Sequence, residues 1–206
     1  IPMGGDGKIE LNLRMFSDPS LLHWDFMTAM NMGMTAEKLA AMGYTREEMD
    51  AWGARSHQLA YKAQQEGFFD EEILPVDVKQ GDGTVRTVDT DQAVRPDATV
   101  EDMAKLKPVF KKNGTIHAGN SSPLNAGATA LVLMDRETAE RKGVKPLARI
   151  VSIGFAGVEP NVMGTGPVPS TQRALEAAGL DASDIDFWEI NEAFAVVALY
   201  ASKELG

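Results

Sequence analysis

The sequence predicts an α/β protein, and three observations support that prediction. From about residue 116 onward, short apolar runs alternate with helical patterns, which is the order expected of strands and helices in a layered domain. The run GATALVLM at 127–134 is continuous and apolar, as in a strand buried on both faces. The first half is instead irregular and rich in helical patterns. We therefore predict a boundary near residue 117 and a weaker one near Lys145.

The helices predicted in the first half begin and end at recognisable signals. A short helix is expected from Thr35, as N-cap, to Gly43. In the longer helix that follows, Thr45 and Glu48 have the spacing of a capping box. One face of this helix is interpreted as core packing. Its residues are Met49, Trp52, Ser56, Leu59, Ala60 and Ala63.

Further elements follow along the chain. Two strand-like pieces, EEILPVDV and TVRTVDT, flank the turn QGDG and predict a hairpin. A short helix at 100–106 is expected after the N-cap Thr99. In the second half, helices are predicted at DRETAERKG, with Asp135 as cap and Gly143 as stop, and at STQRALEAAG. Strands are predicted at LARIVSIGFAGV and IDFWEI, the latter leading into a helix that begins near Asn191.

Composition excludes several classes of function. The formal net charge of −10 argues against nucleic-acid binding, which needs a basic face. The longest apolar runs are too short to span a bilayer. The chain has no cysteine, so it contains no disulfide and no thiol nucleophile. Its 3 histidines share no short ligand spacing, and no metal site is predicted. The start IPMGGDGK and the end KELG are typical of an internal fragment.

Four polar clusters are candidates for chemistry. They are the loop GTIHAGNSSPLNAG, the lysine-rich stretch before it, the loop VEPNVMGTGPVPST, and Asn191 with Glu192. Taken alone, the first is interpreted more readily as a solvent loop and the second as a solvated face. Asn191 and Glu192 lie between a predicted strand and a predicted helix, where α/β sheets place ligands. Local pattern leaves them equally open as helix caps or as active-site groups.

In order and spacing, five motifs together resemble the thiolase family of acetyl-CoA acetyltransferases and 3-ketoacyl-CoA thiolases. They are NMGMTAEKLA, RSHQLA, VRPDATVEDMAKLKPVFKKNGTIHAGNSS, VMGTGPVPST and EINEAFA. The resemblance implies two layered αβαβα halves and an inserted, helix-rich loop domain. It assigns residues 1–117 to that CoA-covering loop domain, 118–145 to the end of the N-terminal half, and 146–206 to the start of the C-terminal half.

The resemblance also implies an activity. Thiolases cleave a 3-ketoacyl-CoA with free CoA, or condense two acyl-CoA molecules, through an acyl-cysteine. In the family, that cysteine lies upstream of IPMGG, and a histidine and a second cysteine lie downstream of KELG. The chain alone is therefore predicted to be inactive, with coenzyme A as a substrate and no cofactor. The alternative is a non-catalytic thiolase-like protein that binds CoA or acts as a scaffold.

Site residues carry over by resemblance at matching positions. Asn191 matches the catalytic Asn that holds a water in an oxyanion hole, and Glu192 looks like a supporting residue. Substrate-binding positions are Met32, Arg95, Val109, Phe110, Ala118, Gly119, Ser122, Met163, Ala193 and Phe194. Three positions depart from family patterns, namely Asn31, Asp102 and Ala126. The resemblance further implies acyl-CoA metabolism, a homodimer or homotetramer, association with the remaining thiolase segments, and a cytoplasmic or organelle-matrix location.

Overall fold

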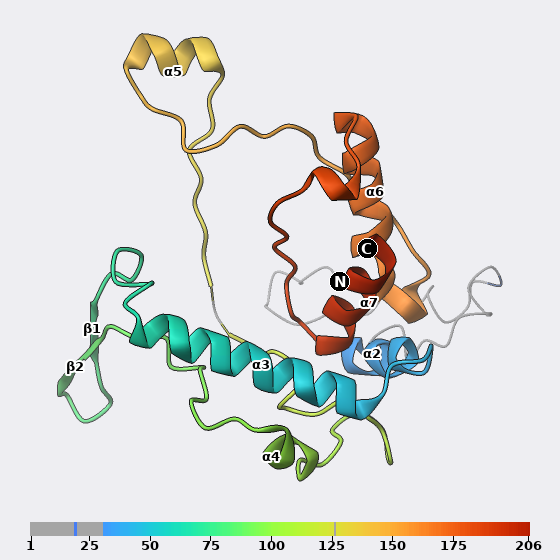
Figure 1. Cartoon of the computed structure of the whole chain (residues 1–206). Helices are drawn as coiled ribbons and strands as arrows, with labels where there is room; N and C mark the ends of the chain where they lie inside the picture. Colours follow the sequence, from blue (N-terminus) through green and yellow to red (C-terminus); the bar gives the residue numbers. More distant parts are fainter. Residues whose placement is uncertain (1–18, 20–30, 126) are drawn as a thin grey trace.

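The structure is a computed structural model that describes residue 19 and residues 31–206 except residue 126 (Figure 1). Most of the first 30 residues of the expected loop domain, and the departure at Ala126, lie outside the described residues.

Two consecutive helices open the described chain. Helix α2 runs Met32–Ala40, and the side chain of Asn31 accepts a hydrogen bond from the Met34 N–H at 3.2 Å. Asn31, and not Thr35, is therefore the N-cap, because the amide at 31 reaches the free N–H groups one turn earlier. Helix α3 spans Arg46–Gln65 and starts with the predicted capping box, which is confirmed.

The predicted hairpin is also confirmed. Strands β1 (Val76–Lys79) and β2 (Val85–Val88) pair antiparallel, and their side chains are mostly exposed. Helix α4 (Val100–Ala104) follows, with Thr99 as its N-cap as expected. In Figure 1 the hairpin lies beyond the C-terminal end of α3, whereas α4 lies alongside that helix.

The second half contributes helices and turns. Helix α5 (Arg136–Lys142) ends at left-handed Gly143, as predicted. The 3-10 helix η3 (Pro160–Thr165) leads into α6 (Pro167–Ala178), which begins earlier than predicted because proline is favoured in a first helical turn. After the 3-10 helix η4 (Ala182–Asp184), helix α7 (Ala195–Leu205) closes the chain.

The core forms where α2, α3 and α7 meet (Figure 1). Residues 195–198 and Ala201 of α7 are buried, and α2 and the first turns of α3 pack against that helix. The buried cluster consists of Ala36, Leu39, Ala40, Met49, Ile116, Ala195, Val196 and Val197. The apolar face predicted for α3 is buried only at its start, since Met49 is inaccessible whereas Leu59 is 49% exposed. Ala60 and Ala63 are only partly buried, so the core interpretation is wrong for the second half of that face.

Three predicted strands are also wrong as strands in this structure. Segments 127–134, 147–158 and 185–190 have no strand structure among the described residues, and Val132 and Phe187 are 87% and 90% exposed. A strand requires backbone hydrogen bonds to a neighbour. In the part of the chain that the structure describes, strand pairing is confined to β1 with β2 and one bridge between Ser121 and Phe194. Apolar sequence alone does not make a sheet.

Candidate functional site

The loop at 114–122 is held on one side by helix α2. The Glu37 carboxylate accepts hydrogen bonds from the backbone N–H groups of Thr115 and Ile116, each at 2.9 Å. Glu37 is only 6% exposed, and a buried carboxylate is tolerated where several donors satisfy it. Helix α2 thus sets the start of the loop.

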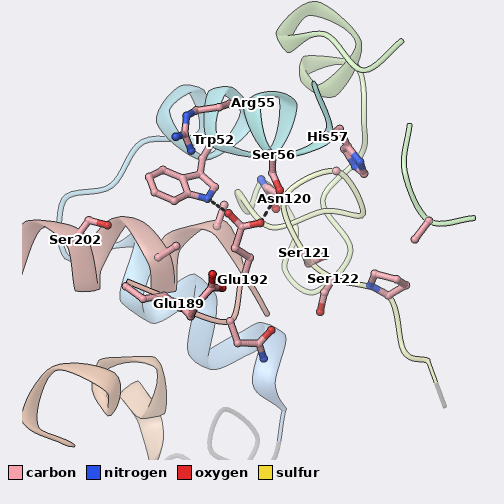
Figure 2. A pocket seen from close by; sticks show the side chains of 18 of the residues that line it. Trp52, Arg55, Ser56, His57, Asn120, Ser121, Ser122, Glu189, Glu192 and Ser202 are labelled. Atoms are coloured by element: carbon pink, nitrogen blue, oxygen red, sulfur yellow. Dashed lines mark hydrogen bonds between the residues drawn. The ribbon is translucent and has the colours of Figure 1, made fainter. Parts of the chain in front are cut away.

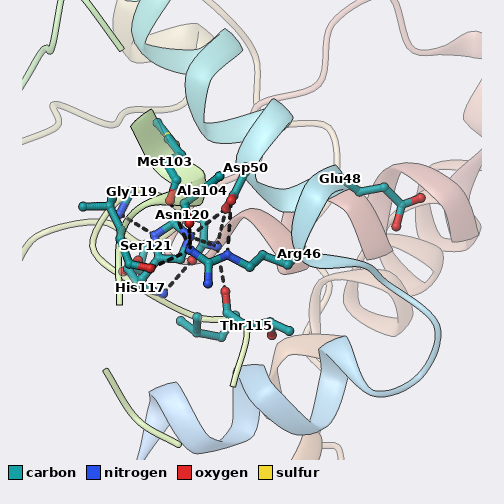
Figure 3. A network of polar contacts seen from close by, with 12 residues as sticks. Arg46, Glu48, Asp50, Met103, Ala104, Thr115, His117, Gly119, Asn120 and Ser121 are labelled. Atoms are coloured by element: carbon teal, nitrogen blue, oxygen red, sulfur yellow. Dashed lines mark hydrogen bonds and ion pairs between the residues drawn. The ribbon is translucent and has the colours of Figure 1, made fainter. Parts of the chain in front are cut away.

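On the other side, the loop is held by a buried polar network centred on Asp50 of α3 (Figure 3). The Asp50 carboxylate accepts from Nε2 of His117 at 2.7 Å, from Nδ2 of Asn120 at 3.1 Å, and from Nε of Arg46 at 3.3 Å. Arg46 also donates to the Met103 carbonyl in α4 at 3.1 Å. Asp50, which is 2% exposed, and its partner Arg46 therefore join α3 to both α4 and the loop.

The tautomer of His117 follows from its contacts. The Gly119 N–H donates to Nδ1 at 3.1 Å, so Nε2 carries the hydrogen that faces Asp50. Burial lowers the pKa of His117 below its usual range, and the Asp50 carboxylate opposes that shift without overcoming it. The ring is therefore neutral near pH 7 and acts as a fixed spacer between Asp50 and the loop.

A short backbone joint connects this loop to the start of α7. The Ser122 N–H donates to the Ala193 carbonyl at 2.9 Å, and the Ala195 N–H donates to the Asn120 carbonyl at 2.9 Å. An isolated antiparallel bridge pairs Ser121 with Phe194 at the same place. Residues 120–122 and 193–195, about seventy positions apart in sequence, thus lie side by side.

The start of α7 tests one of the two interpretations of Asn191 and Glu192, that of helix caps. Helix α7 begins at Ala195 with Phe194 as its N-cap residue, so neither polar residue caps it. The Glu192 carboxylate turns to α3 instead, where it accepts from Nε1 of Trp52 and Oγ of Ser56, each at 2.6 Å (Figure 2). Asn191 is exposed. The helix-cap interpretation is therefore wrong for α7, and the active-site interpretation stays a prediction.

Two cavities meet at residues 188–191, which line both of them. A cavity of about 460 Å³ lies between α2, η3, α6 and the start of α7. It brings together five of the predicted site residues: Met32, Met163, Asn191, Ala193 and Phe194. A second cavity, of about 920 Å³, lies between α3, the 119–123 loop and α7. Asn191 thus faces both spaces.

A third cavity, of about 1030 Å³, collects the remaining predicted residues beside α4. These are Arg95, Val109, Phe110, Ala118, Gly119 and Ser122. Gly119 and Ser122 also line the second cavity, so the spaces adjoin along the loop. The carboxylate of Asp102, a departure from the family pattern, bonds the Lys105 ammonium at 2.7 Å in this region. That bond lowers the pKa of Asp102.

Three side chains that line the second cavity were not among the predicted site residues: Trp52, Ser56 and His57. The first two were interpreted as core packing, yet they hold Glu192. Ser56 was the available signal, since a hydroxyl on an otherwise apolar helix face needs a partner. The His57 ring accepts from the Arg95 backbone N–H at 3.3 Å. Burial and then the Arg95 charge lower the pKa of His57, against the opposing effect of Glu192.

No group of three or more histidine, cysteine, aspartate or glutamate side chains within residues 31–206, residue 126 aside, has the geometry to hold a metal ion. No helix in that part of the chain is both long and apolar enough to cross a membrane.

Comparison with known families gives two matches along the chain. The model described as thiolase, N-terminal domain matches residues 8–137, and that described as thiolase, C-terminal domain matches residues 144–206. Among curated relatives, the 3-ketoacyl-CoA thiolase of Marinobacter nauticus is 48% identical over 97% of this chain and 51% of its own length. The beta-ketothiolase of Cupriavidus necator is 48% identical over 99% of this chain and 50% of its own. The chain spans about half the length of the curated relatives it matches.

Solved structures agree with these matches and confirm a partial α/β thiolase fold. The Bacillus anthracis acetyl-CoA acetyltransferase superposes with a TM-score of 0.80 at 46% identity, over 84% of this chain and 44% of its own. The human mitochondrial 3-ketoacyl-CoA thiolase in complex with CoA superposes with a TM-score of 0.78 at 40% identity, over 84% of this chain and 43% of its own.

Proposed function

This chain belongs to the thiolase family, and from that premise we propose that it serves an acetyl-CoA C-acyltransferase or acetyltransferase. The enzyme cleaves a 3-ketoacyl-CoA with free CoA, or condenses two acyl-CoA molecules in reverse. The observation that carries the proposal is the backbone joint between residues 120–122 and 193–195. It sets Asn191 where two cavities meet, beside the loop that bears Ser122.

In the proposed reaction, a cysteine thiolate attacks the 3-keto carbon and takes the acyl group. The bond between C2 and C3 then breaks, and its electron pair forms an enolate on the departing acetyl-CoA. Asn191 supports that enolate oxygen by holding a water that donates to it, as an oxyanion hole does. The second cysteine gives a proton to the enolate carbon, which completes acetyl-CoA, and takes one from the thiol of free CoA. The CoA sulfur then attacks the thioester, takes the acyl group and releases the first cysteine as a thiolate. Because the chain has no cysteine, we assign the thiolates and the histidine to polypeptide outside it, and expect the chain alone to be inactive.

We assign the adjoining cavities to different parts of the substrate. The space lined by Met32 and Met163 would take the acyl end, since its walls include thioethers and the Phe194 ring. The cavity beside α4 would take the pantetheine, with Ser122 as a polar partner, and the nucleotide end near Arg95. The solved relative with bound CoA supports this class of ligand. Coenzyme A is then a substrate, and no cofactor is invoked.

Further expectations belong to the same proposal. We place the CoA-covering loop domain at 1–117, the end of the N-terminal half at 118–145 and the start of the C-terminal half at 146–206. We expect a homodimer or homotetramer in the cytoplasm or, in a eukaryote, an organelle matrix.

Thiolysis of acetoacetyl-CoA by the full-length native polypeptide that carries this chain tests the proposal. Chromatography would quantify the acetyl-CoA formed when free CoA is supplied. The Asn191→Ala variant should lower kcat by about 10²-fold, the lower end for loss of an oxyanion-hole donor. An active wild type with an equally active N191A would refute the role of Asn191. A wild type that binds CoA without thiolysis would instead establish the alternative, a non-catalytic CoA-binding or scaffold protein.

A further inference from the structure

Glu192 ties the segment that carries Asn191 to helix α3 at two points. Its Oε1 accepts from the Trp52 indole and its Oε2 from the Ser56 hydroxyl (Figure 2). Trp52 and Ser56 are four residues apart in α3, and so lie on one helix face. Because each carboxylate oxygen has its own donor, both the position and the plane of the carboxylate are set.

The backbone just after Glu192 is held from the other side. The Ala193 carbonyl and the Ala195 N–H bond to the loop at 120–122. Asn191 differs from these neighbours, because it is exposed and its amide has no hydrogen bond to the rest of the described chain. Only the few backbone torsions between two adjacent residues separate it from the anchored Glu192.

We propose that Glu192 is a positioning residue, which orients Asn191 toward the junction of the two cavities by clamping the 191–194 segment to α3. This inference rests on the proposed function, since it assigns a support for the group that acts on the enolate oxygen. A carboxylate suits the task because it accepts at both oxygens, and both neighbours are donors. Glutamine at this position would keep the volume but turn an NH₂ group toward a donor.

The test compares kcat and KM for acetoacetyl-CoA thiolysis in the full-length native polypeptide. We expect Glu192→Gln to lower kcat by about 10-fold to 100-fold, since small misplacements of catalytic groups have effects of this size. KM should change less than about 3-fold, because Glu192 lines neither of the two cavities assigned to the substrate. The exposed Glu176 of α6 provides a matched control, and E176Q should behave as wild type.

A double variant separates positioning from general destabilisation. If Glu192 acts through Asn191, then N191A combined with E192Q should be no slower than N191A alone. A double variant slower by the full E192Q factor, or an E192Q enzyme with wild-type kcat, would overturn the inference. If E192Q does not fold, then Ser56→Ala, which removes one donor only, should lower kcat with KM retained, and an unchanged kcat in S56A would overturn it equally.

Hydrogen exchange provides a readout that does not depend on turnover. The backbone amides of Ser122 and Ala195, which bond across the joint, should exchange at least about 10-fold faster in E192Q than in E176Q, because local opening depends on such anchoring contacts. Unchanged exchange at these amides would overturn the clamp even in a protein that lacks thiolysis. Wild-type protein without thiolysis, or N191A without loss, would count against the proposed function and not against the clamp.

Discussion

Replacing Asp50 with Asn would remove the charge at the centre of the buried network while keeping the size of the side chain. The Asp50 carboxylate accepts bonds from His117, Asn120 and Arg46 at 2.7, 3.1 and 3.3 Å. Asparagine has a single acceptor oxygen, and its NH₂ group would face a donor. If the Asn carbonyl oxygen keeps facing His117, the NH₂ group takes the place of the oxygen that accepts from Arg46, and that hydrogen bond is lost.

The magnitude follows from burial and from the lost charge. Asp50 is 2% exposed, so a donor left without its acceptor is not rescued by bulk water. Loss of one hydrogen bond to a charged group lowers stability by about 1.5–3 kcal/mol, and breaking a buried ion pair by about 3–5 kcal/mol. Because Arg46 is partly exposed, with 23% of its side chain accessible, we expect about 3 kcal/mol. In a chain of this size that lowers Tm by about 6–12 °C.

Urea unfolding followed by circular dichroism, with thermal unfolding alongside, would measure the effect of D50N. The exposed Asp186 is the matched control, and D186N should lie within about 0.5 kcal/mol of the parent chain. A D50N chain that unfolds at the same urea concentration and temperature as D186N would refute the reasoning. It would mean that the network is not a stabilising centre of the fold.

Three further outcomes are expected in the same chain. Burial lowers the pKa of both His117 and His57, so the folded state favours neutral rings. The free energy of unfolding should therefore be highest above about pH 6.5 and decrease as the pH falls below that value. In urea titrations at several pH values, His117→Gln should make that decrease smaller. Gly53→Ala would drive a methyl group into the Gly119 carbonyl and should lower stability by about 1–3 kcal/mol, whereas Gly81→Ala, with open space around it, should leave the unfolding midpoint nearly unchanged. Thr45→Ala removes half of the capping box of α3 and should lower stability by about 0.5–2 kcal/mol; an unchanged melting temperature would argue that α3 is held by packing alone.

Local signals in the sequence were sufficient wherever the structure depends on near neighbours. The capping box at Thr45 and Glu48, the N-caps at Thr99 and Asp135, and the stop at Gly143 all follow from contacts within a few residues. Such contacts form in any environment that lets a helix begin. The same holds for the hairpin, whose turn and strands are contiguous.

The site was found from the sequence only in part. Motif resemblance selected Asn191 and the residues of the adjoining cavities, but the pattern around residue 191 did not distinguish a helix cap from an active-site group. The start of α7 at Ala195 excluded the cap, and the partners of Glu192, one of which is 140 positions away along the chain, appeared only in the folded structure. Trp52 and Ser56 looked like packing residues because helical periodicity shows which residues share a helix face, but not what that face contacts.

By itself, the sequence determined the family motifs, the helix ends and the absence of a thiol in this chain. Only the tertiary structure decided which polar groups meet, and whether apolar segments such as 127–134 become strands. The physical reason is the range of the interactions. Caps and turns are satisfied within one helical turn, whereas a carboxylate clamp or a sheet depends on partners that folding must bring from far along the chain.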